Sequence, residues 1–99
     1  MTERFRLNAR IDTDAPAMLR PVLEQIAGSR GATLTEVRGG FELQGEWIGS
    51  SARDLNRGLL SELRRTVRRT RLRSEWTHGS ETERFFDYVP KGRTRAPAG

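Results

Sequence analysis

The stretch FELQGEWIGSSARDLNRGLLSELRRTV, residues 41–67, changes its hydrophobic period midway and thereby decides the fold. In its first part apolar or small residues alternate with polar ones, so Phe41, Leu43, Gly45 and Trp47 share one face of a strand. After residues 49–51, which offer a serine cap, the apolar spacing changes to that of a helix, expected over about residues 52–69. Its apolar stripe consists of Leu55, Leu59, Leu60, Leu63 and Val67. A strand followed directly by an amphipathic helix indicates an α+β domain with two packed layers.

The residues before this stretch predict another strand and another helix. Residues 4–11 alternate cleanly between polar and apolar side chains, which indicates a half-buried strand. Asp14 is expected to cap a helix that ends near Ala27. Pro21 should bend that helix or delay its start, because proline has no N–H to donate.

Two hairpins complete the predicted sheet. Residues 33–37 form a weaker strand, and a loop over residues 38–40 would place Val37 opposite Phe41. Residues 70–77 and 81–89 form the last two strands around a turn at residues 78–80. A loop of that length would pair Leu72 with Phe86 and Arg71 with Asp87. Residues 1–90 are thus expected to form a single domain, and residues 91–99 a disordered basic tail.

The order β-α-β-β-α-β resembles the ferredoxin-like fold over most of the chain. This resemblance implies a two-layer sandwich in which both helices cover one face of an antiparallel sheet. An additional C-terminal strand would extend the sheet beside the fourth. The fold implies no function. The outward positions of residues 4–11 and 41–48 carry no aromatic ring, unlike RNA-recognition motifs, and Asp12 and Asp14 would repel phosphate where acylphosphatase-like enzymes bind it.

Composition argues against most enzyme chemistry. The chain has no cysteine, and its one histidine, His78, lies in an expected turn, so neither a metal site nor a catalytic triad is expected. We therefore expect a non-enzymatic protein without cofactor or metal. No apolar segment resembles a signal peptide or reaches the ~18–20 residues of a membrane span, so a cytoplasmic location without membrane association is expected.

Positive charge is concentrated in the second helix and the start of the next strand. Residues 51–73 contain eight arginines against Asp54 and Glu62, so this segment carries a charge of +6 and the rest of the chain −1, which together give the net charge of +5. The candidate binding residues are Arg53, Arg57, Arg64, Arg65, Arg68, Arg71 and Arg73. They could bind nucleic acid through its phosphates, or an acidic protein. A solvated helix face, enriched in arginine by a GC-rich genome, explains the same pattern.

Two further features have competing interpretations. Phe85, Phe86 and Tyr88 cluster in the last strand, and adjacent Phe85 and Phe86 cannot face the same core. If that strand is the sheet edge, its aromatic residues could pair with a second copy or another protein, which gives a homodimer as the rival to nucleic-acid binding. Asn56 falls inside the apolar stripe and needs hydrogen-bond partners, either structural ones or those of a cleft.

Overall fold

The computed structural model describes residues 2–95, although not the side chain of Arg95. These residues form an α+β fold with two helices and one six-stranded sheet. In chain order the elements are β1 Glu3–Asp12, α1 Pro16–Arg30, β2 Thr33–Val37, β3 Gly40–Gly49, α2 Ala52–Thr66, β4 Arg71–His78, β5 Glu81–Phe86 and β6 Val89–Arg95. Neither helix is long and apolar enough to cross a membrane.

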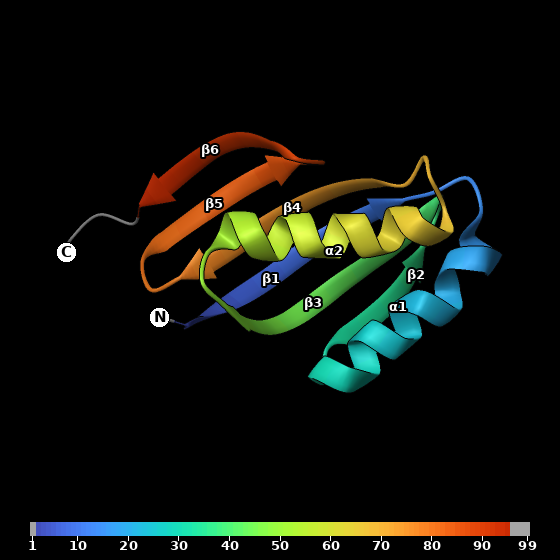
Figure 1. Ribbon diagram of the computed structural model, residues 1–99, viewed down its shortest axis with the longest axis horizontal. Helices are drawn as coiled ribbons and strands as arrows, with labels where there is room; N and C mark the ends of the chain where they lie inside the picture. Colours follow the sequence, from blue (N-terminus) through green and yellow to red (C-terminus); the bar gives the residue numbers. More distant parts are fainter. Residues whose placement is uncertain (1, 96–99) are drawn as a thin grey trace.

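The sheet is antiparallel throughout and its strand order is β2-β3-β1-β4-β5-β6. Both helices lie on one side of it, with α1 near β2 and β3 and α2 across β3 and β4 (Figure 1). No helix covers the other side. We call this uncovered side the open face, and in β1 it is formed by the outward residues Arg4, Arg6, Asn8 and Arg10.

Alternation of side chains in the central strands builds the core. The apolar residues of β1, including Leu7 and Ile11, are buried beneath the helices, while the residues between them lie on the open face. Leu60 and Leu63 of α2 are completely buried, and each contributes about 2 kcal/mol by leaving water. Trp47 and Trp76 meet edge to face across the core. The predicted pattern of buried and exposed residues is therefore confirmed for the central strands and for α2.

The helix termini differ in part from those predicted. Ser51 caps α2 as expected, because its hydroxyl accepts a hydrogen bond from the Asp54 N–H at 3.1 Å. The helix ends at Thr66 rather than residue 69, since the β-branched Val67 already has extended backbone angles. Asp14 does not cap α1. The residue before that helix is Ala15, whose N–H donates to the Thr13 hydroxyl. Pro21 is accommodated inside α1.

Both predicted hairpin registers are wrong by one residue, because each turn contains two residues instead of three. Val37 pairs with Gly40, and the turn between them relies on Gly39 at φ +82°. Gly40 belongs to the strand and must be glycine, since a Cβ there would lie 1.8 Å from the carbonyl oxygen of Ile11. In the second hairpin His78 pairs with Glu81, so Phe86 lies opposite Arg73 rather than Leu72.

A sixth strand replaces most of the predicted tail. The expected single strand over residues 81–89 is interrupted at Asp87 and Tyr88, which turn the chain into β6. Asp87 has φ +56°, a conformation that aspartate tolerates better than most residues. Residues 91–95, expected to be disordered, belong to β6, which pairs with β5 through a register shift near Arg84. Residues 96–99 of the predicted tail lie outside the described residues.

Candidate anion-binding surfaces

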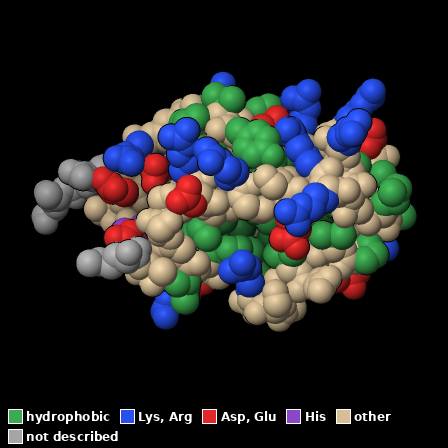
Figure 2. All heavy atoms as spheres, in the orientation of Figure 1, with side chains coloured by type: hydrophobic (Ala, Val, Ile, Leu, Met, Phe, Trp, Pro, Cys, Tyr) green, Lys and Arg blue, Asp and Glu red, His purple; other side chains and the backbone are tan. Residues whose placement is uncertain are grey.

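The predicted arginine cluster does not form one surface, because its members lie on both sides of the sheet. Arg53, Arg57 and Arg65 project from α2, and the turn after the helix carries Arg68 and Arg69; all five are exposed. We call these five residues the α2 arginine surface. Figure 2 shows Lys and Arg side chains along α2 and around its C-terminal end, with hydrophobic and acidic side chains between them.

Most of this charge has no counterion among the described residues. Of the eight arginines of residues 51–73, only Arg64 has a carboxylate of the described residues within 4.0 Å. Arginines elsewhere are more often neutralised, as Arg4 is by Glu46 and Arg20 by Glu36. The two acids within the segment do not change this, since Asp54 accepts a hydrogen bond from Ser50 at the helix N-terminus and Glu62 forms no ion pair within 4.0 Å among residues 2–95. The α2 arginine surface is therefore an unneutralised cationic region.

Arg64 has a structural role that the sequence did not indicate. Its Nε donates to the Thr70 carbonyl at 3.0 Å, and its Nη2 lies 3.3 Å from Oδ2 of Asp87. Its guanidinium also stacks over the ring of Tyr88, 5.4 Å from the ring centre. These contacts fasten the β5–β6 turn and the start of β4 to α2. Arg64 is thus the member of the predicted set with the fewest donors left for a ligand.

Asn56 is buried and fully engaged in structural hydrogen bonds. Its side chain is 1% exposed, and its Nδ2 donates to the Asp87 carbonyl at 2.8 Å. Its Oδ1 accepts from the Ser74 hydroxyl at 2.5 Å and from the Trp76 indole at 3.3 Å. The structural interpretation of Asn56 is therefore confirmed, and the residue does not face a cleft.

Arg71 and Arg73 lie on the open face, away from the α2 arginine surface. They flank the buried Leu72 in β4, and their guanidinium groups stack over the ring of Phe86 at 5.9 and 5.4 Å. The expected pair of Arg71 with Asp87 does not form. Asp87 instead accepts a hydrogen bond from the Leu72 N–H and contacts Arg64.

The aromatic cluster is also divided. Phe85 is buried in the core at 4% exposure, so it cannot line an interface, whereas Phe86 is half-buried on the open face. Their opposite orientation confirms that the two rings do not share a core. Tyr88 is 44% exposed in the β5–β6 turn and lies against α2, with its hydroxyl 3.2 Å from that of Ser61. The strand that carries Phe85 and Phe86 is not an edge, because β6 covers it.

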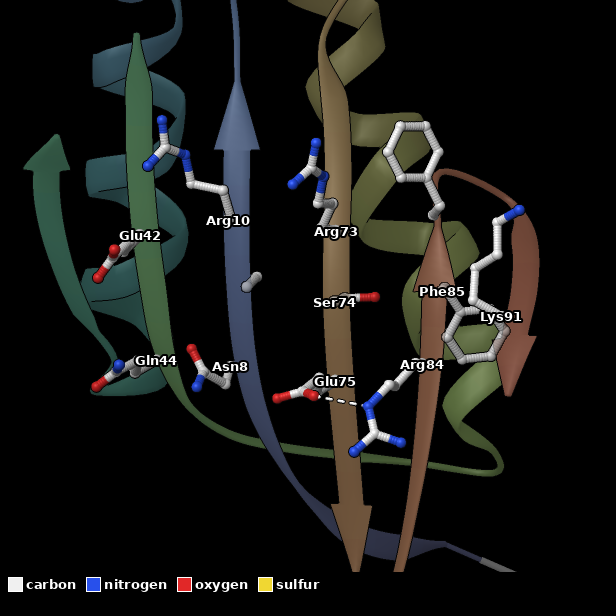
Figure 3. A pocket seen from close by; sticks show the side chains of 12 residues that line it. Asn8, Arg10, Glu42, Gln44, Arg73, Ser74, Glu75, Arg84, Phe85 and Lys91 are labelled. Carbon is white, nitrogen blue, oxygen red and sulfur yellow. Dashed lines mark hydrogen bonds and ion pairs between the residues drawn. The ribbon is translucent and has the colours of Figure 1, made fainter. Parts of the chain in front are cut away.

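The open face contains a groove of about 470 Å³ that the sequence did not reveal. Figure 3 shows the side chains along it, contributed by β3, β1, β4, β5 and β6. Its cationic residues are Arg10, Arg73, Arg84 and Lys91. Arg84 is neutralised by Glu75, with 2.8 Å between Nε and Oε2. The neighbouring positions of Arg10 and Arg73 follow from the strand order, which places β1 beside β4.

Two further candidates are a metal site and the single histidine. No group of three or more histidine or acidic side chains within residues 2–95 could hold a metal ion. His78 is engaged with the chain itself, because its Nδ1 lies 3.0 Å from the Arg4 carbonyl and its ring packs on Phe5. At the outer hairpin, the hydrogen bond that Arg93 donates to Glu83 and the negative charge of Glu83 raise the pKa of Arg93.

Comparison with protein-family models, curated proteins and solved structures finds no match for this chain.

Proposed function

We propose that this protein is a non-enzymatic module that binds nucleic acid through the α2 arginine surface. The observation that carries the proposal is the absence of counterions: Arg53, Arg57, Arg65, Arg68 and Arg69 have no carboxylate of the described residues within 4.0 Å. Unneutralised guanidinium groups are suited to bidentate contacts with phosphate. On binding, the arginines would displace the counterions condensed on the phosphates, and the release of these ions supplies free energy of association.

The same arginines favour binding that does not depend on base sequence. Arginines on the outside of one helix and its following turn can follow a phosphate backbone, but no arrangement of asparagine or glutamine beside them is suited to reading base edges. Arg64 adds to the positive electrostatic potential of this surface, although it forms an ion pair with Asp87. The ligand is therefore expected to be a polyanion recognised through its charge.

The test is fluorescence anisotropy with labelled duplex DNA of random sequence over a series of salt concentrations. With up to five phosphates contacted, log K should fall with log salt at a slope of about −4. Arg57→Glu combined with Arg65→Glu should reduce the magnitude of the slope by about 2 and weaken binding at least tenfold. Neither residue makes a contact that holds the fold together, so both variants should remain folded.

A matched control separates local charge from net charge. Arg6 and Arg38 are exposed, lie away from α2, and have no ion pair among the described residues. Arg6→Glu combined with Arg38→Glu changes the net charge by the same amount and should weaken binding far less. Equal losses in the two double variants, or no binding at low salt, would refute the proposal.

Homodimer formation through the aromatic strand, the alternative expected from the sequence, has less support. The edge strand next to β5 is β6, which contains Pro90, Gly92 and a register shift, and such features oppose pairing with another strand. Tyr88 already contacts α2 of its own chain, since its ring lies under the Arg64 guanidinium and its hydroxyl contacts that of Ser61. Sedimentation equilibrium at high protein concentration tests this alternative: a dimer would support it, and a monomer would argue against it.

We also propose that β1 to β4 and the two helices form a ferredoxin-like unit. Two observations support this assignment. Each strand–helix–strand segment encloses one other strand, since β1 and β2 flank β3, and β3 and β4 flank β1. Both helices lie on the same side of the sheet (Figure 1). In this description β5 and β6 extend the sheet from β4.

A further inference from the structure

We propose that the groove on the open face binds the phosphate group of a small phosphate monoester between Arg10 and Arg73. This site is distinct from the α2 arginine surface, because the sheet lies between the two. Its main feature is an unfavourable arrangement of charges. Arg10 and Arg73 are directly opposite each other in the β1–β4 pair, where like charges destabilise a sheet.

Among the described residues, no carboxylate lies between the two guanidinium groups to offset their repulsion. Arg73 has no carboxylate of residues 2–95 within 4.0 Å, and the partner of Arg10 is Asp12, two residues further along the same strand. Glu42, opposite Arg10 on the other side, points toward β2 in Figure 3 and makes no ion pair with it. Glu75 is neutralised by Arg84. An external anion would therefore relieve a repulsion that the protein itself leaves in place.

The two guanidinium groups are available in different ways. Arg10 is held in position, because its Nε donates to Asp12 at 3.0 Å and its Nη2 donates to the Arg38 carbonyl at 2.6 Å. Since arginine has five N–H groups, about three remain for a ligand. Arg73 stacks on Phe86, and its side chain makes no hydrogen bond with the described part of the chain, so its N–H groups can bind a ligand. In Figure 3 its guanidinium leans toward β1, the strand that carries Arg10.

The rest of the groove suits a small organic phosphate. Its volume of about 470 Å³ lies within the range of small-molecule sites, ~300–1,000 Å³. Lys91 adds a third cation without an ion pair among the described residues, and the ring of Phe86 provides an apolar wall beside Arg73. Asn8 and Gln44 place amide groups next to Arg10 and Glu42 along the strands. A phosphate bound between the arginines would thus leave its organic group in a polar cleft with one aromatic side.

The test compares AMP with adenosine, which lacks the phosphate, by isothermal titration calorimetry at low salt and by thermal shift. AMP should bind and raise the melting temperature, and adenosine should bind at least tenfold more weakly. Arg73→Gln should weaken AMP binding about tenfold, because it removes one charged phosphate contact. The matched control is Arg6→Gln, on the same strand and face as Arg10 but opposite the neutral Thr77, and it should leave AMP binding within about twofold.

The outcomes distinguish this site from the nucleic-acid surface. Arg57→Glu with Arg65→Glu should leave AMP binding unchanged, and Arg73→Gln should leave the salt slope for duplex DNA unchanged. Equal binding of AMP and adenosine, no binding of either, or equal effects of Arg73→Gln and Arg6→Gln would overturn the proposed site. Loss of AMP binding in the α2 double variant would overturn the separation of the two surfaces.

Discussion

Replacement of Asp87 tests how the β5–β6 turn is attached to α2 and β4. In Asp87→Ala the fully buried Leu72 N–H loses its acceptor, which costs about 1–3 kcal/mol. The ion pair with Arg64, whose two side chains are only 30% and 17% exposed, is also lost and contributes about 1 kcal/mol. Alanine at φ +56° adds about 1 kcal/mol of backbone strain. We therefore expect a total loss of about 3–5 kcal/mol.

Two further variants separate these contributions. Asp87→Asn keeps the oxygen that accepts from Leu72 and tolerates the positive φ, so it should lose only the Arg64 ion pair, about 1 kcal/mol. Asp87→Gly loses both side-chain interactions but relieves the strain, so it should be about 1 kcal/mol more stable than Asp87→Ala. The expected order of stability is wild type, Asn, Gly, Ala.

Urea denaturation followed by tryptophan fluorescence measures these differences, because Trp47 and Trp76 are both almost completely buried. Domains of this size are stable by ~5–15 kcal/mol, so even Asp87→Ala should retain a measurable folded baseline. The slope of the transition should not change among the variants. A loss below about 1 kcal/mol in Asp87→Ala would refute the reasoning, and equal losses in the Ala and Asn variants would show that charge, not the Leu72 hydrogen bond, dominates.

Two other substitutions should change stability in opposite directions. Asn56→Ala leaves the Asp87 carbonyl without its buried donor and opens a small cavity, so it should cost about 3 kcal/mol in the same urea experiment. Gly58→Ala should increase stability by about 1 kcal/mol while leaving duplex DNA binding unchanged, because a Cβ at this exposed helical position meets no atom within 4 Å. A loss of stability in Gly58→Ala would mean that the glycine is needed for packing.

The sequence predicted the element order and the buried faces because both depend on hydrophobic period. The alternation of Phe5, Leu7 and Ile11 and the stripe of leucines in α2 leave one way to bury each element. These features are local, and the period of a strand or helix is enough to reveal them.

The errors arose where tertiary contacts decide the structure. Glycine-containing turns allowed a two-residue or a three-residue loop, and only the packing of the paired strands selects the shorter one. β6 has the composition of a linker, and it is ordered by pairing with β5. The turn at Asp87 lacks glycine, and the contacts that stabilise it come from Arg64, Leu72 and Asn56, which are distant in sequence.

The division of the arginines follows from the same tertiary contacts. A helix that continued to residue 69 would have aligned Arg68 with Arg57 and Arg64 on one flank. Because α2 ends at Thr66 and β4 begins at Arg71, the chain passes from the helix layer into the sheet within a few residues. Alternation in β4 then turns Arg71 and Arg73 to the open face. The basic segment thus contributes to two cationic surfaces: it supplies the α2 arginine surface, and its Arg73 joins Arg10 in the groove on the open face. Because the first is extended and the second confined, we propose a long polyanion as the ligand of the first and a single phosphate group as that of the second.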